Sequence, residues 1–435
     1  MEIVNSFFEK IKHVSKEDIV KVFSFTSLST IVRMLTGFVS VKVVSIIIGP
    51  AGVAMVGQLN NFVTMAQNFA SAGINSGVTK YIAEYKGQEV IKSYLSTSLR
   101  MIIGCSLLFG ILIIFFNGVL SERIMQDVEY RYLFIILGVA LIFFALNNLL
   151  ISIVNGYKQF KKYVIINIAN SVLGLCYTLA LVFLWGLRGA LIGSVTFHSI
   201  MFFITILLIR KETWLKRAYF NLPFDKQIAK KLLAFTAMTI VSVSLVPLGQ
   251  MILRGYVMSE ISPVDAGIWE GMNRLSNMYL SIITTSLAVY VLPRLSEITD
   301  KTEIILELKK IYKIILPILL LGFIIIYLIK TPLIKLLFTE DFIPMKSLFI
   351  WQLSGDFFKI FSWLLGYLLL AKSMTKAFIA TEVMYNALFV VLAFVFMKFN
   401  GIVGITQAYL INFVIYSIVL VLFFKFFYFN KKTAC

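Results

Sequence analysis

The amino-acid sequence predicts an all-α membrane protein with about twelve transmembrane helices in two pseudo-symmetric six-helix bundles. Apolar residues make up 59% of the 435 residues, charged residues only 14%, and the mean hydropathy is +0.90. A water-soluble chain needs about a quarter of its residues charged to cover its surface. Apolar stretches of about 18 or more residues, each long enough to cross a bilayer, also recur along the whole chain.

These stretches give the expected spans in chain order. Short connections with turn residues, such as Gly49-Pro50, Asn155-Gly156 and Asn400-Gly401, separate several of them. The expected spans are 22–48, 53–78, 95–117, 132–154, 163–185, 189–210, 232–256, 266–292, 311–330, 345–370, 377–397 and 402–427.

The domain organisation follows from these spans and from the charged segments that flank them. The first twenty residues are rich in charge and contain no apolar core, so we expect no cleavable signal peptide. We predict a cytoplasmic amphipathic lead-in at 1–21, an N-terminal bundle at 22–210, a cytoplasmic linker at 211–231, a C-terminal bundle at 232–427 and a cytoplasmic tail at 428–435.

A weak internal repeat relates the two bundles. Ala51-Gly-Val opens the second span and Ala266-Gly-Ile opens the eighth, while Gly186-Leu-Arg-Gly189 resembles Gly401-Ile-Val-Gly404. Both pairs have nearly the same sequence offset. Because each bundle has an even number of helices, the repeat predicts a two-fold axis along the membrane normal with a cavity between the halves.

The distribution of basic residues predicts the orientation. Of the 40 Lys and Arg residues, 28 fall on the side that holds both termini. Basic residues concentrate on the cytoplasmic side of membrane proteins, so both termini are expected in the cytoplasm of a bacterial cell, with the chain in the inner membrane. The net charge of +18 is therefore explained by topology and membrane lipids, and not by nucleic acid.

The sequence offers no constellation for catalysis, metal or nucleotide binding. Its two histidines, His13 and His198, and its three cysteines are isolated, and no Walker A loop is present. We therefore expect no enzyme activity, no cofactor and no direct use of ATP. His198 is interpreted as a satisfied core or interface residue.

When basic residues at the helix ends are counted with the adjoining loops, four remain inside the spans, where a charge is costly unless it faces protein or water. They are Arg33, Lys42, Arg274 and Lys359. The functional interpretation is a cationic cavity that binds a phosphate or diphosphate group, with Arg33 near mid-span. The alternative is that each cation is a structural partner of a carboxylate on a neighbouring helix, and Lys42 could also extend to the outer end of its span.

The eighth span carries a polar stripe at helical spacing. A cavity wall with a cation for substrate is the functional interpretation, and neutralisation of Glu270 by Arg274, four residues away, is the alternative. The stripe consists of Glu270, Asn273, Arg274, Asn277, Ser281 and Thr284.

A second, uncharged stripe occupies the equivalent place in the first half. Gln58, Asn61, Asn68 and Asn75 predict either a matching cavity wall or hydrogen bonds that join helices.

Three carboxylates are candidates for coupling transport to an ion gradient, namely Glu270, Asp356 and Glu382. A buried carboxylate can exchange a proton, which suits coupling. The alternative for Glu382 is a salt bridge to Arg33 or Lys359.

Several segments resemble the Wzx-type flippases of bacterial O-antigen and enterobacterial common antigen pathways, across about residues 22–427. The resemblance implies the fold of the multidrug/oligosaccharidyl-lipid/polysaccharide exporters, a cationic cavity between two six-helix bundles, and alternating access. The segments are Ala72-Gly-Ile-Asn-Ser-Gly-Val-Thr-Lys80-Tyr, Gly267-Ile-Trp-Glu-Gly, Leu292-Pro-Arg-Leu-Ser and Trp351-Gln-Leu-Ser-Gly-Asp-Phe-Phe-Lys359.

The resemblance also implies a substrate and partners. The expected cargo is an undecaprenyl-diphosphate-linked oligosaccharide, flipped from the cytoplasmic to the periplasmic leaflet by a monomer that works beside a polysaccharide polymerase and a chain-length regulator. Coupling would be to a proton or sodium gradient. This chain has Asn277 where relatives can carry an acidic residue, so the position of the coupling residue stays open.

Three other functions remain to be weighed. A multidrug or lipid II exporter could share the fold, although an exporter of organic cations should have an acidic cavity. A membrane enzyme of polysaccharide assembly should have larger outer loops than this chain offers. A non-transporting scaffold would not need charges inside the membrane.

Overall fold

The structure is a computed structural model that describes residues 16–85, 87–372 and 374–429. Most of the predicted lead-in at 1–21, including His13, and nearly all of the predicted tail at 428–435 lie outside the described residues. All regular elements in the described ranges are helices. Seven of them are long and apolar enough to cross a membrane, which agrees with the predicted all-α membrane fold.

Three of the long helices turn sharply at a glycine, so each contains all or most of two predicted spans, although the span expected at 53–78 ends at Ala70. They are α2 (Lys16–Ala70), α7 (Phe160–Ile209) and α13 (Thr375–Phe423). The turns lie at Gly49, Gly186 and Gly401, whose φ angles of 62°, 54° and 52° are in the left-handed region. Glycine adopts these angles without the strain that a Cβ causes, so it marks the turn.

The other long helices are single. They are α4 (Gln88–Phe115), α6 (Arg131–Gly156), α8 (Lys226–Glu260), α9 (Pro263–Glu297), α10 (Lys301–Leu328) and α12 (Phe349–Ala371). Shorter helices connect them: α3 (Asn75–Glu84), α5 (Asn117–Leu120) and α11 (Lys330–Leu337), with short 3₁₀ or π-helical elements at 121–125, 128–130, 213–215, 217–219, 340–347 and 424–429.

Three helices of the second half begin with a side chain that caps the first turn. Asp225, Ser262 and Asp300 accept hydrogen bonds from backbone N–H groups at the starts of α8, α9 and α10. A capping oxygen satisfies N–H groups that have no partner inside the helix, so these residues fix where each helix starts.

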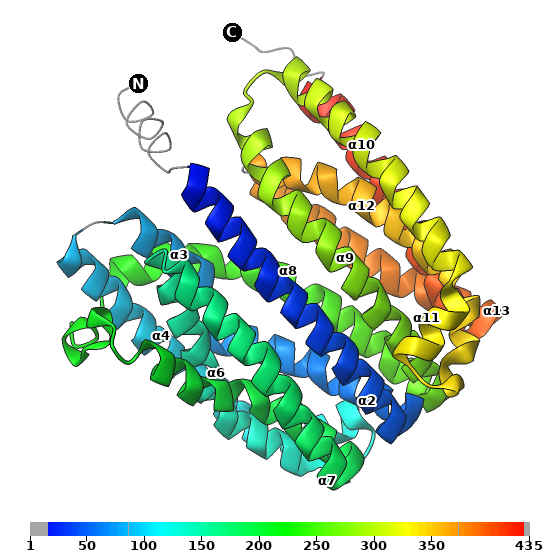
Figure 1. The fold of residues 1–435 in the computed structure, drawn as a ribbon, viewed down its shortest axis with the longest axis horizontal. Coiled ribbons are helices and arrows are strands. Elements are labelled where there is room, and N and C mark those ends of the chain that lie inside the picture. The colour runs from blue at the N-terminus through cyan, green and yellow to red at the C-terminus, as the bar shows by residue number, and fades with distance from the viewer. Residues whose placement is uncertain (1–15, 86, 373, 430–435) are drawn as a thin grey trace.

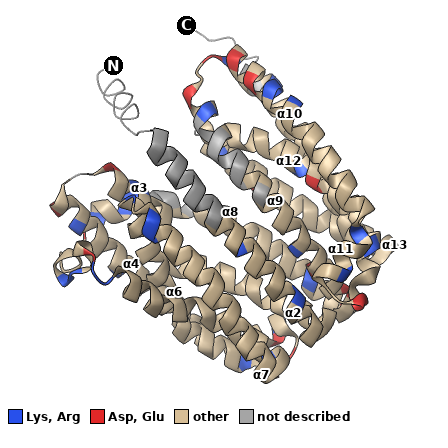
Figure 2. Ribbon diagram, in the orientation of Figure 1, with Lys and Arg blue, Asp and Glu red and all other residues tan. Residues whose placement is uncertain are grey.

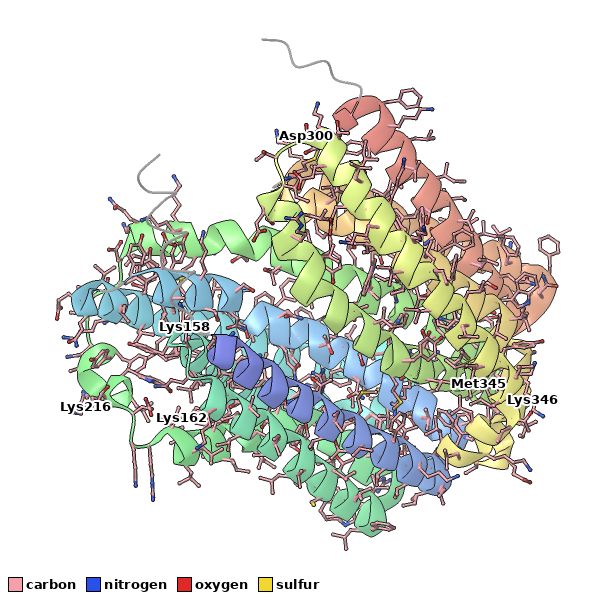
Figure 3. The ribbon with its side chains drawn as sticks, turned by 45° about the horizontal axis from the view of Figure 1, so that its top comes forward. Lys158, Lys162, Lys216, Asp300, Met345 and Lys346 are labelled. Carbon is pink, nitrogen blue, oxygen red and sulfur yellow. The ribbon has the colours of Figure 1, made fainter. Side chains whose placement is uncertain are left out.

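The helices form two groups, α2 to α7 and α8 to α13 (Figure 1). The first residue of α2 and the last described element, at 424–429, lie at the same end of the molecule, which we call the terminal end, and the ribbons diverge toward it. Lys158, Lys162 and Lys216 lie at this end, whereas Met345 and Lys346 lie at the opposite, distal end (Figure 3).

The two halves pack closely at the distal end. Gly267 on α9 lies directly against Pro50 on α2, so that a Cβ at position 267 would overlap the Pro50 carbonyl group. Gln126 Nε2 donates a hydrogen bond of 2.8 Å to the backbone oxygen of Gly255 across the same boundary. The missing side chain at Gly267 therefore allows the two halves to approach closely.

The internal repeat is visible in the backbone. Gly189 packs against the backbone of Leu181 after the turn at Gly186, and Gly404 packs against the backbone of Phe396 after the turn at Gly401. Each half therefore closes its last two helices with the same glycine turn, as the sequence repeat predicts.

Charged residues concentrate at the helix ends and connections, and few lie along the middle of the described helices (Figure 2). This pattern is expected when the middle of each helix faces lipid or packed apolar side chains. The few charges inside the bundle therefore define where a polar site can be.

Candidate functional site

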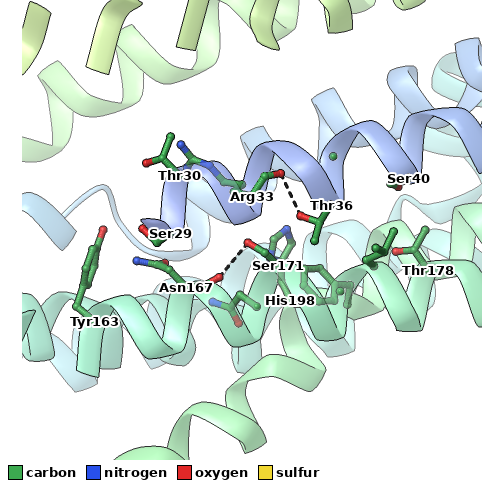
Figure 4. A pocket seen from close by; sticks show the side chains of 15 residues that line it. Ser29, Thr30, Arg33, Thr36, Ser40, Tyr163, Asn167, Ser171, Thr178 and His198 are labelled. Carbon is green, nitrogen blue, oxygen red and sulfur yellow. Dashed lines mark hydrogen bonds between the residues drawn. The ribbon is translucent and has the colours of Figure 1, made fainter. Parts of the chain in front are cut away.

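A cavity of about 470 Å³ lies between α2 and α7 in the N-terminal half (Figure 4). We call it the entry cavity. Most of its lining side chains are hydroxyls and amides, with one cation, Arg33. The lining residues are Ser29, Thr30, Arg33, Thr36, Gly37, Ser40, Tyr163, Asn167, Asn170, Ser171, Gly174, Leu175, Thr178, Phe197 and His198.

Helical spacing places these groups on facing surfaces. On α2, Ser29, Arg33, Thr36 and Ser40 follow each other at intervals of four, three and four, which keeps them on one side. Several of these hydroxyl groups donate a hydrogen bond to a backbone oxygen of their own helix. Thr36 Oγ1, for example, donates to Val32 O at 2.9 Å. Their oxygen atoms still offer acceptor capacity to a ligand.

The facing wall comes from the first segment of α7. Asn167, Ser171, Gly174 and Thr178 again follow at intervals of four, three and four. Ser171 Oγ donates to the backbone oxygen of Asn167 at 2.9 Å. The two helices therefore enclose a polar space that no charged pair fills.

Arg33 contributes a free cation to this space. Its side chain is exposed in the entry cavity, and within the described ranges no carboxylate pairs with it. The functional interpretation of Arg33 as a group facing a cavity thus agrees with its placement, and the alternative of a structural salt bridge finds no partner there.

A second cavity of about 300 Å³, the deep cavity, adjoins the entry cavity through Ser40, Thr178, Phe197 and His198, which line both. It extends toward the boundary with the C-terminal half. The remaining lining residues are Val44, Val56, Asn60, Ala190, Gly193, Ser194, Glu270 and Arg274.

Glu270 joins two arginines at the edge of the deep cavity. Its Oε1 accepts from Arg274 Nε at 2.9 Å, and its Oε2 accepts from Arg254 Nη2. The Arg254 side chain is fully buried, whereas 20% of the Arg274 side chain is exposed. With all three groups ionised the cluster carries one net positive charge, and Arg274 is its accessible member.

Arg254 was not among the residues expected to act inside the membrane, since it fell near the outer end of its span. The structure corrects this, because Arg254 packs over Trp269 at 5.5 Å and pairs with Glu270 inside the protein. Both predicted interpretations of Glu270 and Arg274 hold in part: they pair with each other, and they also line a cavity.

Lys42 does not enter either cavity. Its Nζ donates to the backbone oxygens of Lys335 and Phe338 at 2.7 and 2.5 Å. These carbonyls lie at the C-terminal end of α11, where helical carbonyls have no partner of their own and attract a cation. The expected cationic wall therefore lacks Lys42, which instead joins the two halves at the distal end.

Lys359 also lies away from both cavities, in the C-terminal half. Its Nζ sits over the rings of Trp363, Tyr409 and Phe413, at 5.3, 5.8 and 5.8 Å from their centroids. A cation is stabilised over aromatic faces. The expectation that Lys359 faces the same cavity as Arg33 is therefore wrong, because Lys359 lies among aromatic rings of the C-terminal half.

Asp356 lies beside Lys359 and is fully buried. It accepts hydrogen bonds from Ser276 Oγ and Tyr409 Oη, both at 2.7 Å, and from the Tyr279 hydroxyl. The Gln352 amide also donates to it, at 3.4 Å, so hydrogen bonds satisfy this buried carboxylate, and no described residue forms an ion pair with it. Asp356 thus belongs to a polar cluster of its own, separate from the deep cavity.

Glu382 lies on the first segment of α13 and is half-buried. In the described part of the chain its carboxylate forms no ion pair, so the alternative of a salt bridge to Arg33 or Lys359 is wrong. Its helix neighbour Tyr385 packs against Tyr416 at 5.2 Å. This leaves Glu382 and Asp356 as two carboxylates of the C-terminal half that no cation neutralises directly.

The uncharged stripe of α2 lines neither the entry cavity nor the deep cavity, and two of its residues bond a neighbouring helix. Gln58 Nε2 donates to Met251 O at 3.1 Å, and Asn61 Nδ2 donates to Gln250 Oε1 at 3.2 Å. Asn68 bonds its own helix at Thr64 O. The alternative of interhelical hydrogen bonds therefore describes Gln58 and Asn61 correctly.

Asn75 does not belong to that stripe, because α2 ends at Ala70 and Asn75 begins α3. On α9, Asn273 and Asn277 line neither of the two cavities, although Asn277 is exposed. The expected amide walls are therefore misplaced, and the amides that do line the cavities are Asn60, Asn167 and Asn170.

Sequence reasoning missed the wall of α7 and misjudged His198. Asn167, Ser171 and Thr178 have the same helical spacing as the cavity-lining residues of α2, and this spacing could have identified the wall. Sequence reasoning selected charged residues inside the spans, and these short polar side chains carry no charge. His198 is exposed, lines both cavities and is not a satisfied core residue.

Comparison with known proteins identifies the family of this chain. Residues 19–299 match the family described as "Polysaccharide biosynthesis protein". The chain is 28% identical over 393 residues to the Lipid III flippase of Escherichia coli (strain K12), and equally to that of Shigella flexneri; the match covers 90% of this chain and 94% of each relative.

Solved structures share the fold. An inward-facing multidrug resistance MATE family transporter of the MOP superfamily has a TM-score of 0.72 at 17% identity, covering 91% of this chain and 94% of its own. The Lipid II flippase MurJ in an inward closed conformation has a TM-score of 0.73 at 16% identity, covering 93% and 87%. With a family match across most of its length and this shared membrane fold, the chain belongs to the polysaccharide biosynthesis protein family.

Proposed function

We propose that this protein is a flippase that moves an undecaprenyl-diphosphate-linked oligosaccharide from the cytoplasmic to the periplasmic leaflet of the inner membrane. The observation that carries the proposal is the entry cavity, where the unpaired Arg33 lies among hydroxyl and amide side chains. A diphosphate is anionic and can bind Arg33, and a sugar is rich in hydroxyl groups that can bond the hydroxyl and amide side chains. The entry cavity therefore has groups that fit both parts of such a lipid headgroup. The resemblance to Lipid III flippases over nearly the full chain supports the same substrate class.

The route follows from the arrangement of the halves. The distal end is closed by the contacts of Gly267 with Pro50 and of Lys42 with α11, while the entry cavity lies along the part of α2 nearer the terminal end. We propose that the terminal end, which carries the basic segments, is cytoplasmic. The substrate headgroup would then enter from the cytoplasmic side and leave after the distal contacts separate.

The electrostatics favour an anion over an organic cation. Arg33 and Arg274 line the cavities, and Glu270, the one carboxylate among the described lining residues, is shared between two guanidinium groups. A lipophilic cation would meet net positive charge there, which costs more in a space of low dielectric than in water. This argues against the multidrug exporter, although that family shares the fold.

Coupling and assembly complete the proposal. Glu270 is held between two arginines, so we assign coupling to the proton or sodium gradient to the C-terminal half, at Asp356 or Glu382. We also propose that the protein works as a monomer without a cofactor, carries out no chemical reaction, and delivers its substrate to a polysaccharide polymerase and its chain-length regulator.

Genetic complementation tests the function. A bacterial strain that lacks its own lipid-linked oligosaccharide flippase should regain surface polysaccharide when it expresses this chain, and should not regain it with Arg33→Ala present in the membrane at the same level. Failure of the wild-type chain in strains that represent several oligosaccharide structures would overturn the proposal. Arg188→Ala, which removes an exposed arginine paired with Glu129 on the surface, is the matched control and should complement fully.

A further inference from the structure

His198 lies where the entry cavity meets the deep cavity, and its side chain is exposed to that space (Figure 4). The residue follows the turn of α7 by about three helical turns, on the second segment of that helix. Among the described residues, the cations that line the two cavities are Arg33 in the entry cavity and Arg274 in the deep cavity. A headgroup that reaches both arginines would extend through the junction that His198 lines together with Ser40, Thr178 and Phe197.

Packing fixes the imidazole ring. Its centroid lies 5.3 Å from that of Phe144 with an interplanar angle of 79°, and 4.8 Å from that of Phe197 with an angle of 52°. Phe197 itself is fitted against Gly174, where an added Cβ would approach its ring to 2.5 Å. A ring held on two sides keeps its nitrogen atoms in one place without ordering cost at the moment of binding.

The protein does not use those nitrogen atoms. Across the described residues, no side chain or backbone group forms a hydrogen bond or ion pair with the His198 ring. Neighbouring polar groups are committed elsewhere: Thr196 Oγ1 bonds Ile192 O at 2.7 Å, and Ser194 Oγ bonds Ala190 O at 3.0 Å. A neutral imidazole offers one donor and one acceptor, so a fixed, complementary pair of hydrogen-bonding atoms is directed to the cavity.

We propose that His198 and Phe197 form a sugar-recognition element for the sugar joined to the diphosphate; the inference rests on the proposed function. The ring of Phe197 gives an apolar face for the C–H groups of the sugar, and the imidazole nitrogens pair with its hydroxyl groups. Arg33 and Arg274 then hold the diphosphate. The pair therefore distinguishes a glycosylated lipid from the bare lipid diphosphate.

A neutral hydrogen-bonding role fits the surroundings better than a third cation. The charged groups that line the two cavities are Arg33 from α2 and Glu270 and Arg274 from α9. Because Glu270 already accepts from Arg254 and Arg274, no carboxylate among the described lining residues is left for a charged imidazole. Gln offers a neutral donor and acceptor as His does, so His198→Gln should preserve the role, and His198→Lys should not.

The test measures binding of two probes to the purified full-length protein: undecaprenyl diphosphate carrying one N-acetylhexosamine, and undecaprenyl diphosphate itself. The wild type should prefer the glycosylated lipid. His198→Leu should lower its affinity for the glycosylated lipid about tenfold, as expected for one or two lost hydrogen bonds, and leave the affinity for the bare lipid unchanged. His198→Gln should retain most of the preference.

Two controls make the result decisive. Ile200→Ala, on the same helix and exposed away from the cavity lining, should behave as wild type, and equal melting temperatures should show that each variant is folded. If His198→Leu binds both probes as the wild type does, or loses both equally, the inference is overturned and the proposed function stands. A wild-type protein that binds neither probe overturns the proposed function together with the inference.

Discussion

The ammonium group of Lys42 on α2 donates a hydrogen bond of 2.7 Å to the backbone oxygen of Lys335 on α11, across the boundary between the two halves. The same nitrogen donates to Phe338 O at 2.5 Å. A hydrogen bond from a charged group contributes about 1.5–3 kcal/mol. The contact can form only while the distal ends of the halves are together, so it stabilises the closed distal end.

Replacement of Lys42 by Met should therefore favour opening at the distal end. In a variant without native cysteines, Ser45→Cys, which is 1% exposed in the closed arrangement, should become reactive to a membrane-impermeant thiol reagent once Lys42 is replaced. The control is Lys335→Met, since Lys335 pairs with Glu340 in its own half, at 2.8 Å. Equal labelling of Ser45→Cys with and without Lys42 would show that the contact does not hold the end closed.

Gly267 offers an independent test of the same closure. An Ala at this position would place its Cβ against the Pro50 carbonyl, so the halves could not approach as closely. Gly267→Ala should reduce transport and increase labelling of Ser45→Cys without lowering the amount of protein in the membrane. Gly322→Ala, at an open position on α10, should have no effect. Normal transport by Gly267→Ala would rule out this contact as a necessary step.

Variants of the Glu270 cluster should distinguish a residue needed for folding from a residue needed for transport. Glu270→Gln leaves the buried Arg254 without a counter-charge, which costs about 3–5 kcal/mol when one partner of a buried pair is removed. We expect low yields and a lowered melting temperature. Arg274→Gln keeps the pair of Arg254 with Glu270 and should fold normally while losing transport. The opposite pattern, with a stable Glu270→Gln and an unstable Arg274→Gln, would reverse the roles given to the two arginines.

The sequence predicted the fold well because hydropathy and glycine turns are local properties. The repeat of Gly186 and Gly401 marks equivalent helix ends, and both are found in the left-handed region. Charge within a span also identified Arg33 and Arg274 as cavity residues.

The partners of those charges could not be predicted, because they depend on how helices distant in sequence pack. Lys42 binds carbonyls about 290 residues away, and Arg254 pairs with a carboxylate on the next helix. The amide stripe of α2 has the spacing of a cavity wall, yet α8 covers it. Spacing defines a face of a helix, but only packing decides whether that face meets water or another helix.

Asp356, which accepts hydrogen bonds from three hydroxyl groups, is predicted to couple transport to the ion gradient. Asp356→Asn replaces an acceptor by a group that also donates, facing three hydroxyl donors. We expect this variant to bind substrate normally but to lose the dependence of transport on the ion gradient. Glu382→Gln is its companion in the same half. Gradient dependence that persists unchanged in both variants would place coupling elsewhere in the chain.

Translocation by the purified protein tests the central claim most directly. Proteoliposomes would carry undecaprenyl-diphosphate-linked oligosaccharide, and a lectin added outside would report the sugar as it reaches the outer leaflet. The wild type should expose it faster than protein-free liposomes do, Arg33→Ala should return the rate to that background, and Arg188→Ala should match the wild type. A wild-type rate no higher than in protein-free liposomes under an imposed proton or sodium gradient, or full activity of Arg33→Ala, would contradict the account.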